Sequence, residues 1–166
     1  LHLRFGDHPF NPVFASPLSR ARESATVITG VTPIVIDEFA EVDFGAFEGL
    51  TADEIHERYP EDFTRWNRNR LDPEYAYPGG ERRAAFIKRV NRGVAKMLER
   101  LDGPHQPNGA NAIVVAHRGV IRRITQRLAL AEPVIELGSI QSLIRTLDGG
   151  WRVELLDETA HLAGIA

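Results

Sequence analysis

Hydrophobic positions along the chain alternate between short apolar runs and longer stretches with helical spacing. The apolar runs lie at residues 12–17 (PVFASP), 33–38 (PIVIDE) and 112–117 (AIVVAH). Near-continuous apolar runs of this length are typical of strands that are covered on both faces, as in the parallel sheets of α/β proteins. The pattern therefore predicts three buried strands that run parallel to one another.

A helix is predicted directly after the first of these runs, over residues 18–29 (LSRARESATVIT). Ser16 has a hydroxyl that can cap free amide groups, and Pro17 suits a first helical turn because its missing N–H does no harm there. Gly30 is a typical residue just past a helix end. We therefore expect Ser16 to cap this helix and Gly30 to end it.

The clearest helical pattern covers residues 81–103, and a second covers residues 119–130. In the first, apolar residues recur at steps of three and four, and Gly103 followed by Pro104 marks its end. Residues 142–156 then form two alternating runs around Asp148-Gly149-Gly150, which predicts a β-hairpin. Between residues 39 and 80 the pattern is irregular, with a short helix near 52–59, a break at Pro60 and many aromatic residues.

This order of elements predicts the fold class. We expect a three-layer α/β sandwich with a mostly parallel, doubly wound sheet and an antiparallel edge strand. Mixed, aromatic-rich sequence within such a pattern favours an insertion, so a helical lid is expected at about residues 45–82. No linker or repeat divides the chain, and residues 1–166 are therefore interpreted as a single domain.

Composition narrows the possible partners. The 166 residues carry 20 Lys and Arg against 23 Asp and Glu, a net charge of −3, so neither nucleic acid nor an anionic membrane is expected as a partner. The sequence contains no cysteine, which excludes thiol nucleophiles and cysteine metal sites and fits a reducing cytoplasm, the location that we expect. No apolar run approaches the roughly 18 residues that a membrane span needs.

Charged and titratable residues follow all three predicted strands: Arg20 the first, Glu41 with Asp43 and Glu48 the second, and His117 the third. Each alone is typical of a solvated surface or a satisfied loop histidine. Because the carboxyl ends of parallel strands open onto one edge of the sheet, Arg20, Glu41 and His117 can meet in one crevice. A guanidinium and an imidazole suit a phosphate, and a carboxyl group can protonate a leaving oxygen.

Several segments together resemble a known family. The stretches FASPLSRARESA (14–25), EVDFGAFEGLTADEI (41–55), PGGE (78–81) and VVAHRGV (114–120) are similar, in order, to the successive motifs of the histidine phosphatase superfamily, also called the phosphoglycerate mutase-like family. The resemblance covers essentially the whole chain. It implies a phosphoglycerate mutase-like fold. Glu41-Val42-Asp43-Phe44-Gly45 differs from the Glu-Arg-His-Tyr-Gly of the mutases, so the phosphatase branch is the better match.

The resemblance also implies roles for residues. Arg20 is expected to bind the transferred phosphoryl group, His117 to contact its oxygens, and Glu41 to act as acid and base. The implied activity is hydrolysis of a small phosphorylated metabolite through a phosphohistidine, with no cofactor and no metal, and phosphate or sulfate is expected to fit the site. Arg118 replaces the first of two glycines that usually follow this histidine. The oligomeric state is not predicted.

One motif of the family is missing from these residues. Its nucleophile is a histidine in an Arg-His-Gly triplet, whereas the nearest look-alike here has Phe5, which cannot accept a phosphoryl group. We interpret residues 1–12 as the tail of a first helix with its loop. The strand that carries the nucleophile is then expected before residue 1, between the strands that end at Ser16 and His117. A natural chain without that strand is the alternative.

Other functions remain open from the sequence. A catalytically inactive relative that binds phosphate or regulates, and a phosphoglycerate mutase, are the main alternatives. A nucleotide-binding protein of another kind is disfavoured because the sequence has no G-x-x-x-x-G-K-[ST] loop. Aromatic residues of the insertion either line a substrate pocket or pack the lid itself; they are Phe47, Phe63, Trp66 and Tyr77. The arginine pairs 82–83 and 122–123 are expected on solvated helix faces.

Overall fold

The computed structural model describes residues 10–103 and 111–163, and these divide into two compact units. The first unit comprises Leu1–Glu41 and Val90–Ala166, and the second comprises Val42–Arg89. Helix α5 (Arg83–Leu101) contributes residues to both.

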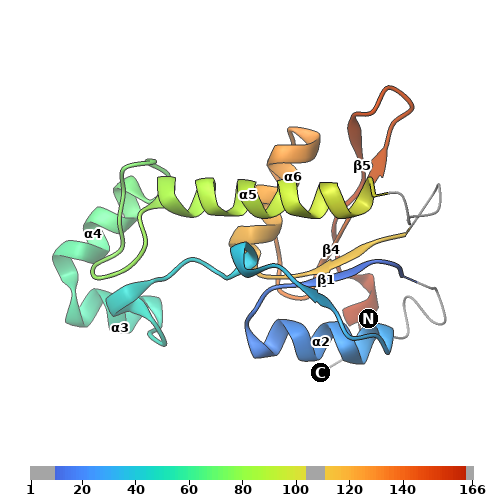
Figure 1. Ribbon diagram of the computed structural model, residues 1–166. Helices are drawn as coiled ribbons and strands as arrows, with labels where there is room; N and C mark the ends of the chain where they lie inside the picture. The colour runs from blue at the N-terminus through green and yellow to red at the C-terminus, as the bar shows by residue number, and fades with distance from the viewer. Residues whose placement is uncertain (1–9, 104–110, 164–166) are drawn as a thin grey trace. The chain divides into compact units, whose positions relative to one another are not determined.

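The first unit is built on a parallel sheet. Its strands are β1 (Val13–Ala15), β2 (Ile34–Val35) and β3 (Ile113–Val115), in the order β2-β1-β3. Helix α2 (Ser19–Thr29) lies on one side of the sheet and α5 on the other (Figure 1). This arrangement confirms the predicted three-layer α/β fold and its three parallel strands. The central strand β1 is buried throughout. The predicted burial is wrong for the edge strand β2, whose Ile34 and Val35 are exposed.

The expected order of strands is wrong in one respect. The strands that end at Ser16 and His117 pair directly, with Phe14 opposite Val114 and with the Ser16 N–H donating to the Val115 carbonyl at 3.0 Å. No strand can lie between them, since β1 and β3 share backbone hydrogen bonds. The segment that we interpreted as the tail of a first helix lies largely in residues 1–9, outside the described residues.

The start of α2 also differs from expectation. Its N-cap is Leu18, without a side-chain cap, and the Ser16 hydroxyl accepts the N–H of Leu18 itself at 3.3 Å, not that of a residue inside the helix. Ser16 is therefore not the helix cap, because it lies two residues before the N-cap and its hydroxyl contacts no amide of the helix. The predicted end is confirmed: Gly30 closes the helix with a φ of 70°, a conformation that glycine adopts without a steric penalty.

The C-terminal part of the first unit holds helix α6 (Arg118–Ala129) and the predicted hairpin. Strands β4 (Ile140–Arg145) and β5 (Trp151–Glu158) pair antiparallel with each other and form a two-stranded sheet of their own, packed against α6. A short 3₁₀ turn, η3 (Ala160–Leu162), follows β5. The hairpin is thus present as predicted, but among the described residues it does not extend the parallel sheet.

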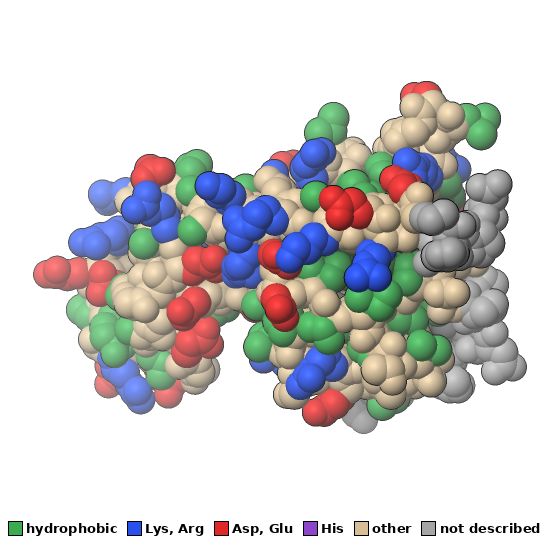
Figure 2. Space-filling model, viewed as in Figure 1, with side chains coloured by type: hydrophobic (Ala, Val, Ile, Leu, Met, Phe, Trp, Pro, Cys, Tyr) green, Lys and Arg blue, Asp and Glu red, His purple; other side chains and the backbone are tan. Residues whose placement is uncertain are grey.

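Buried side chains of α5 anchor that helix to the first unit. Val90, Val94 and Met97 are almost fully buried, and a Cβ added to Gly93 would lie 2.7 Å from the ring of Phe39. Phe39 belongs to the 3₁₀ turn η1 (Asp37–Phe39). The charged side chains of α5 are mainly basic, and Figure 2 shows a row of Lys and Arg side chains along this part of the surface. None of the helices in the described residues has both the length and the apolar character needed to cross a membrane.

The second unit contains η2 (Gly45–Phe47), α3 (Ala52–Arg58) and α4 (Pro60–Asn69). Thr51 and Glu54 form a capping box that starts α3, and Pro60 occupies the first turn of α4. The interior of the unit is an aromatic cluster of rings 5–6 Å apart; it comprises Phe44, Phe47, Tyr59, Phe63, Trp66, Tyr75 and Tyr77. The segment expected as a lid falls within this unit.

Two glycines of the second unit allow two loops to cross closely. Gly45 has a φ of +56°, and a Cβ there would lie 2.2 Å from the Pro78 carbonyl oxygen. A Cβ on Gly80 would lie 2.5 Å from the Asp43 carbonyl oxygen. Backbone hydrogen bonds join the same loops, from Ala46 N to Pro78 O at 2.8 Å and from Glu81 N to Asp43 O at 2.9 Å. This crossing explains why the sequence carries glycine at both places.

Candidate functional site

The carboxyl ends of β1 and β3 bring Ser16 and His117 together. The Ser16 hydroxyl oxygen lies 2.7 Å from Nε2 of His117, although the residues are 101 positions apart in the sequence. Ser16 is fully buried, and His117 is half-buried at the N-cap of α6. Because β1 and β3 share hydrogen bonds up to Ser16, the backbone holds both side chains in register.

Arg20 lies in the first turn of α2 and acts electrostatically on His117. Burial of the imidazole, and secondly the positive charge of Arg20, lower the pKa of His117 from 6.5 to about 4. Both causes disfavour a second proton on the ring, since the charged form loses hydration and meets a like charge. At neutral pH His117 is therefore a neutral imidazole beside a guanidinium.

Glu41 reaches the same place from the segment that follows η1. Its Oε2 accepts a hydrogen bond from the backbone N–H of Gly119 at 3.1 Å. Gly119 is in the first turn of α6, two residues after His117, so the carboxylate lies at the positive end of that helix. The structure thus brings Arg20, Glu41 and His117 to one region at the carboxyl edge of the parallel sheet.

The chemistry available in this region is anion binding together with proton transfer. A guanidinium offers forked donors to phosphoryl oxygens, a neutral imidazole offers one N–H, and a carboxyl group can exchange protons with a leaving oxygen. In the part of the chain that the structure describes, no three His, Asp or Glu side chains cluster so that they could hold a metal ion. The donor set suits an oxyanion such as phosphate.

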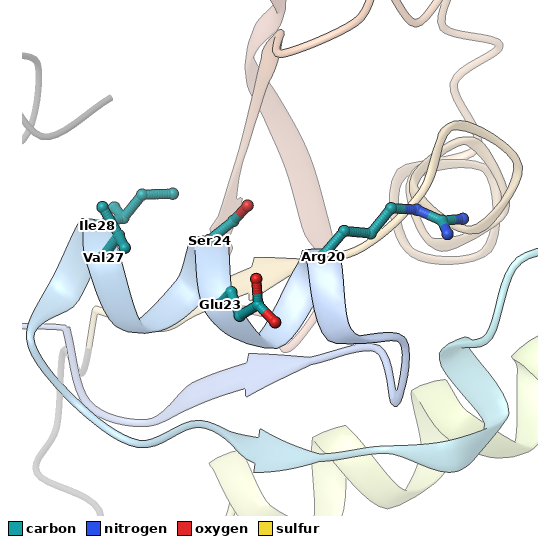
Figure 3. A pocket seen from close by; sticks show the side chains of 5 residues that line it. All are labelled: Arg20, Glu23, Ser24, Val27 and Ile28. Carbon is teal, nitrogen blue, oxygen red and sulfur yellow. The ribbon is translucent and has the colours of Figure 1, made fainter.

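A shallow surface hollow runs along α2 from Arg20 (Figure 3). Glu23, Ser24, Val27 and Ile28 line the rest of it. In Figure 3 the Arg20 side chain extends away from the Val27 and Ile28 end of the helix, and its guanidinium points past the first turn. The guanidinium therefore faces the end of the helix at which His117 lies, rather than the apolar part of the hollow.

Several polar residues have partners that the sequence did not reveal. Arg122 donates to the Pro133 carbonyl at 3.3 Å and Arg123 to Oδ1 of Asn91 at 3.0 Å, and both are half-buried. The expectation of a solvated face is therefore wrong for this pair, because α6 packs these stems against neighbouring segments. Arg118 donates to the Ile135 carbonyl. Arg82 is exposed, as expected, and its Nη1 lies 3.2 Å from Oε2 of Glu74. It precedes α5, however, and Arg83, the first residue of that helix, is half-buried.

The aromatic residues suggested as pocket walls pack mainly on one another. Phe47 is buried, and its ring centroid is 6.1 Å from both Trp66 and Tyr77, while Phe63 lies 5.7 Å from Trp66. These distances are typical of aromatic packing. The four side chains thus pack within the second unit, Phe47 buried and the other three half-buried, and a contact with substrate stays a prediction.

Comparison with known proteins identifies the relatives of this chain. A sequence profile of the histidine phosphatase superfamily (branch 1) matches residues 1–158. A bifunctional protein of Mycobacterium tuberculosis is 32% identical over 160 residues, which cover 90% of this chain and 41% of that protein. An uncharacterized phosphatase of Bacillus subtilis is 26% identical over 165 residues, which cover 95% of this chain and 76% of that protein. The chain thus spans less than half of the mycobacterial relative.

Among solved structures, the fold is similar to the α-ribazole phosphatase of Shigella flexneri. The TM-score is 0.77 at 23% identity, with 95% of this chain and 78% of that chain covered. At this identity the likeness shows the fold alone.

Proposed function

We propose that this chain, which belongs to the histidine phosphatase superfamily, hydrolyses a phosphomonoester of a small metabolite through a phosphohistidine intermediate. The observation that carries the proposal is the meeting of Arg20, His117 and Glu41 at one sheet edge. An uncharacterized phosphatase is among the relatives, which supports hydrolysis. No cofactor enters the proposal, since these side chains are assigned all of the binding and proton transfer.

Arg20 and His117 are proposed to bind the phosphoryl group. A phosphoryl oxygen accepts charge-assisted hydrogen bonds from a guanidinium, and these are roughly twice as strong as bonds between neutral groups. His117 is already held by Ser16 at 2.7 Å, so it is orientated before substrate arrives. A neutral imidazole beside Arg20 can donate one hydrogen bond to the same oxygens without adding a second buried cation.

Glu41 is proposed as the proton donor and acceptor. The Gly119 N–H holds one of its oxygens at 3.1 Å, and because Gly119 lies two residues after His117, this bond brings the carboxyl group to the start of α6, where His117 lies. In this role Glu41 gives a proton to the alkoxide as the ester bond breaks. In the second half-reaction it takes a proton from the water that attacks the phosphohistidine, and the phosphoryl group leaves as inorganic phosphate.

The nucleophile is proposed to be a histidine N-terminal to Leu1. The 166 residues contain no Arg-His-Gly triplet, and Nε2 of His117 is engaged with a buried hydroxyl. The burial pattern of the sheet is compatible with a further strand at an edge, because both edge strands, β2 and β3, are less buried than β1. Such a strand would not lie between β1 and β3, since these two pair directly.

The lid also remains a proposal. Residues of about 45–82 are proposed to shape the choice of substrate, and the support is that Val42–Arg89 forms a compact unit with its own aromatic cluster. The phosphoglycerate mutase alternative differs only in the acceptor of the phosphoryl group. A phosphatase releases inorganic phosphate to water, whereas a mutase returns the group to a second hydroxyl.

A second candidate function is phosphate binding without turnover. The observation that favours it is the contact between Nε2 of His117 and the buried Ser16 hydroxyl, which keeps this ring nitrogen from attacking phosphorus while Arg20 can still bind an anion. Calorimetric titration with inorganic phosphate or vanadate, together with an assay on p-nitrophenyl phosphate, separates the candidates. Binding with turnover supports the phosphatase, and binding without turnover in a form that includes the N-terminal histidine supports the binding module. Absence of binding contradicts both.

A further inference from the structure

We propose that Ser16 is a positioning residue that fixes the tautomer of His117, with the Ser16 hydroxyl donating to Nε2 so that the ring proton sits on Nδ1. The inference deepens the proposed function and rests on it for the identity of the anion. The observation behind it is a fully buried hydroxyl 2.7 Å from a ring nitrogen of a residue at the N-cap of α6.

The hydrogen bonds of Ser16 decide the direction of this contact. A serine hydroxyl has one proton to donate and two lone pairs with which to accept. The Leu18 N–H already donates to Oγ at 3.3 Å. Within the residues that the structure describes, Nε2 of His117 is the acceptor within reach of the hydroxyl proton. If Nε2 carried the proton instead, the hydroxyl of a buried residue would be left without an acceptor, which is costly.

The state of the ring has a consequence for its second nitrogen. A neutral imidazole has one proton, so an acceptor at Nε2 implies a donor at Nδ1. The two nitrogens lie on different edges of the ring, and Nδ1 is the one that Ser16 leaves available. His117 therefore presents an N–H to a phosphoryl oxygen while remaining uncharged. Without Ser16 the ring would exchange tautomers and rotate, and part of its population would present a bare nitrogen to the anion.

The backbone makes this arrangement preorganised. Ser16 N–H donates to the Val115 carbonyl at 3.0 Å, and β1 and β3 are paired over three residues before that point. The two side chains are thus fixed by the sheet and do not depend on a mobile loop for their contact. The position after β1 thus carries a small hydroxyl residue that is fully buried.

Long-range ¹H–¹⁵N NMR of the histidine rings tests the inference directly. The His117 signals are identified by their loss in His117→Gln, and protonated and bare ring nitrogens have well-separated ¹⁵N shifts. At pH 7 we expect a protonated Nδ1 and a bare Nε2 in the wild-type protein. A protonated Nε2 in the wild type would overturn the proposal, and this measurement needs no folded variant at position 16.

Variants add a test of function. Ser16→Ala should convert His117 to a mixture of tautomers and weaken the binding of inorganic phosphate by about tenfold. Ser16→Thr, which keeps the hydroxyl, should restore both. Thr125→Val is the matched control, because Thr125 is a buried hydroxyl of α6 whose partner is the Ile121 carbonyl. An equal effect on phosphate binding from Thr125→Val would show general destabilisation and contradict a specific role for Ser16.

The outcomes separate this inference from the proposed function. A protonated Nδ1 in a protein that does not bind inorganic phosphate upholds the role of Ser16 and refutes the proposed phosphate site. Firm phosphate binding with a protonated Nε2 upholds the site and refutes the role of Ser16.

Discussion

Oε2 of Glu41 accepts the backbone N–H of Gly119 at 3.1 Å, across 78 positions of sequence. The bond joins the segment after η1 to the first turn of α6, and it places a carboxylate where free helix amides favour negative charge. A main-chain donor can hydrogen-bond to the oxygen of a carboxylate and also to that of a neutral amide. A substitution that keeps this oxygen and removes the titratable proton can therefore separate the position of Glu41 from its role in proton transfer.

Glu41→Gln is predicted to slow turnover without loss of phosphate binding. The glutamine oxygen can still accept the Gly119 N–H, but the side chain can neither protonate a leaving alkoxide nor activate water. The expected fall in kcat is about 10²–10⁴-fold, measured with p-nitrophenyl phosphate in an active form of the protein. Glu48→Gln is the control, since Glu48 accepts the Phe44 N–H within its own loop. Equal rates in wild type and Glu41→Gln would remove Glu41 from the mechanism.

The sequence was sufficient to predict the elements and the residues that follow the strands. Apolar runs identified β1, β2 and β3, and helical spacing identified α2, α5 and α6. The placement of Arg20, Glu41 and His117 in one region followed from a general property of parallel sheets, which needs no knowledge of strand order. The sequence thus predicted two features: the helices and strands, from local hydrophobic patterns, and the parallel direction of the strands.

Strand order and buried polar contacts could not be predicted. Whether β1 pairs with β3 depends on contacts between residues about 100 positions apart, and the apolar runs of the strands are too alike to choose partners. Ser16 precedes a proline and a helix, which is the pattern of a helix cap, and only the neighbouring β3 shows that its hydroxyl meets His117. Arg122 and Arg123 were misjudged because long stems bury themselves against segments distant in sequence.

Arg20→Ala is predicted to weaken the binding of inorganic phosphate or vanadate far more than Arg22→Ala. Residues two apart on a helix point in different directions, and Arg20 is the one whose charge acts on His117. Losing a charge-assisted bond should weaken binding by about 10–100-fold, whereas Arg22→Ala should change it by less than about threefold. Calorimetric titration measures both. Equal effects would mean that the general field of α2, and not one guanidinium, holds the anion.

The stability of the protein is predicted to fall as the pH decreases from about 6.5 to about 4, in part through His117. The pKa of His117 is lowered from 6.5 to about 4 by burial and by Arg20, so over this interval the unfolded ring takes a proton that the folded ring does not. Stability is thus fully present above pH 6.5 and is lost on acidification. His117 contributes about 1–2 kcal/mol to the free energy of unfolding in this way. This is less than the whole pKa shift would give, because the ring is partly hydrated.

Urea unfolding at a series of pH values checks this contribution. His117→Gln should show a shallower loss of unfolding free energy between pH 6.5 and 4 than the wild type. Arg20→Ala should reduce the slope only in part, because burial is the larger cause of the lowered pKa. Identical slopes in wild type and His117→Gln would show that His117 is not buried as a neutral ring.

Gly45→Ala is predicted to destabilise the second unit by more than about 3 kcal/mol. The backbone at Gly45 has a φ of +56°, and the added Cβ would lie 2.2 Å from the Pro78 carbonyl oxygen, so the crossing of the two loops would have to open. Gly49→Ala is the matched control, because Gly49 has a φ of +74° with no atom within 4 Å of a Cβ. That variant should lose only about 1 kcal/mol. Urea unfolding measures the loss of stability in both variants. Similar losses would show that the positive φ alone, and not the close contact with Pro78, destabilises Gly45→Ala.

The nucleophile is predicted to be a histidine outside the 166 residues. His117 is a poor substitute, because Nε2 is engaged with Ser16 and a ring that attacks phosphorus cannot also donate to the phosphoryl oxygens. The 166-residue chain alone should therefore bind inorganic phosphate and show no detectable turnover of p-nitrophenyl phosphate. In a longer protein that contains this chain, rapid quench with labelled substrate should trap an acid-labile phosphohistidine N-terminal to Leu1. Label on His117, or brisk turnover by the 166-residue chain, would overturn the proposed mechanism.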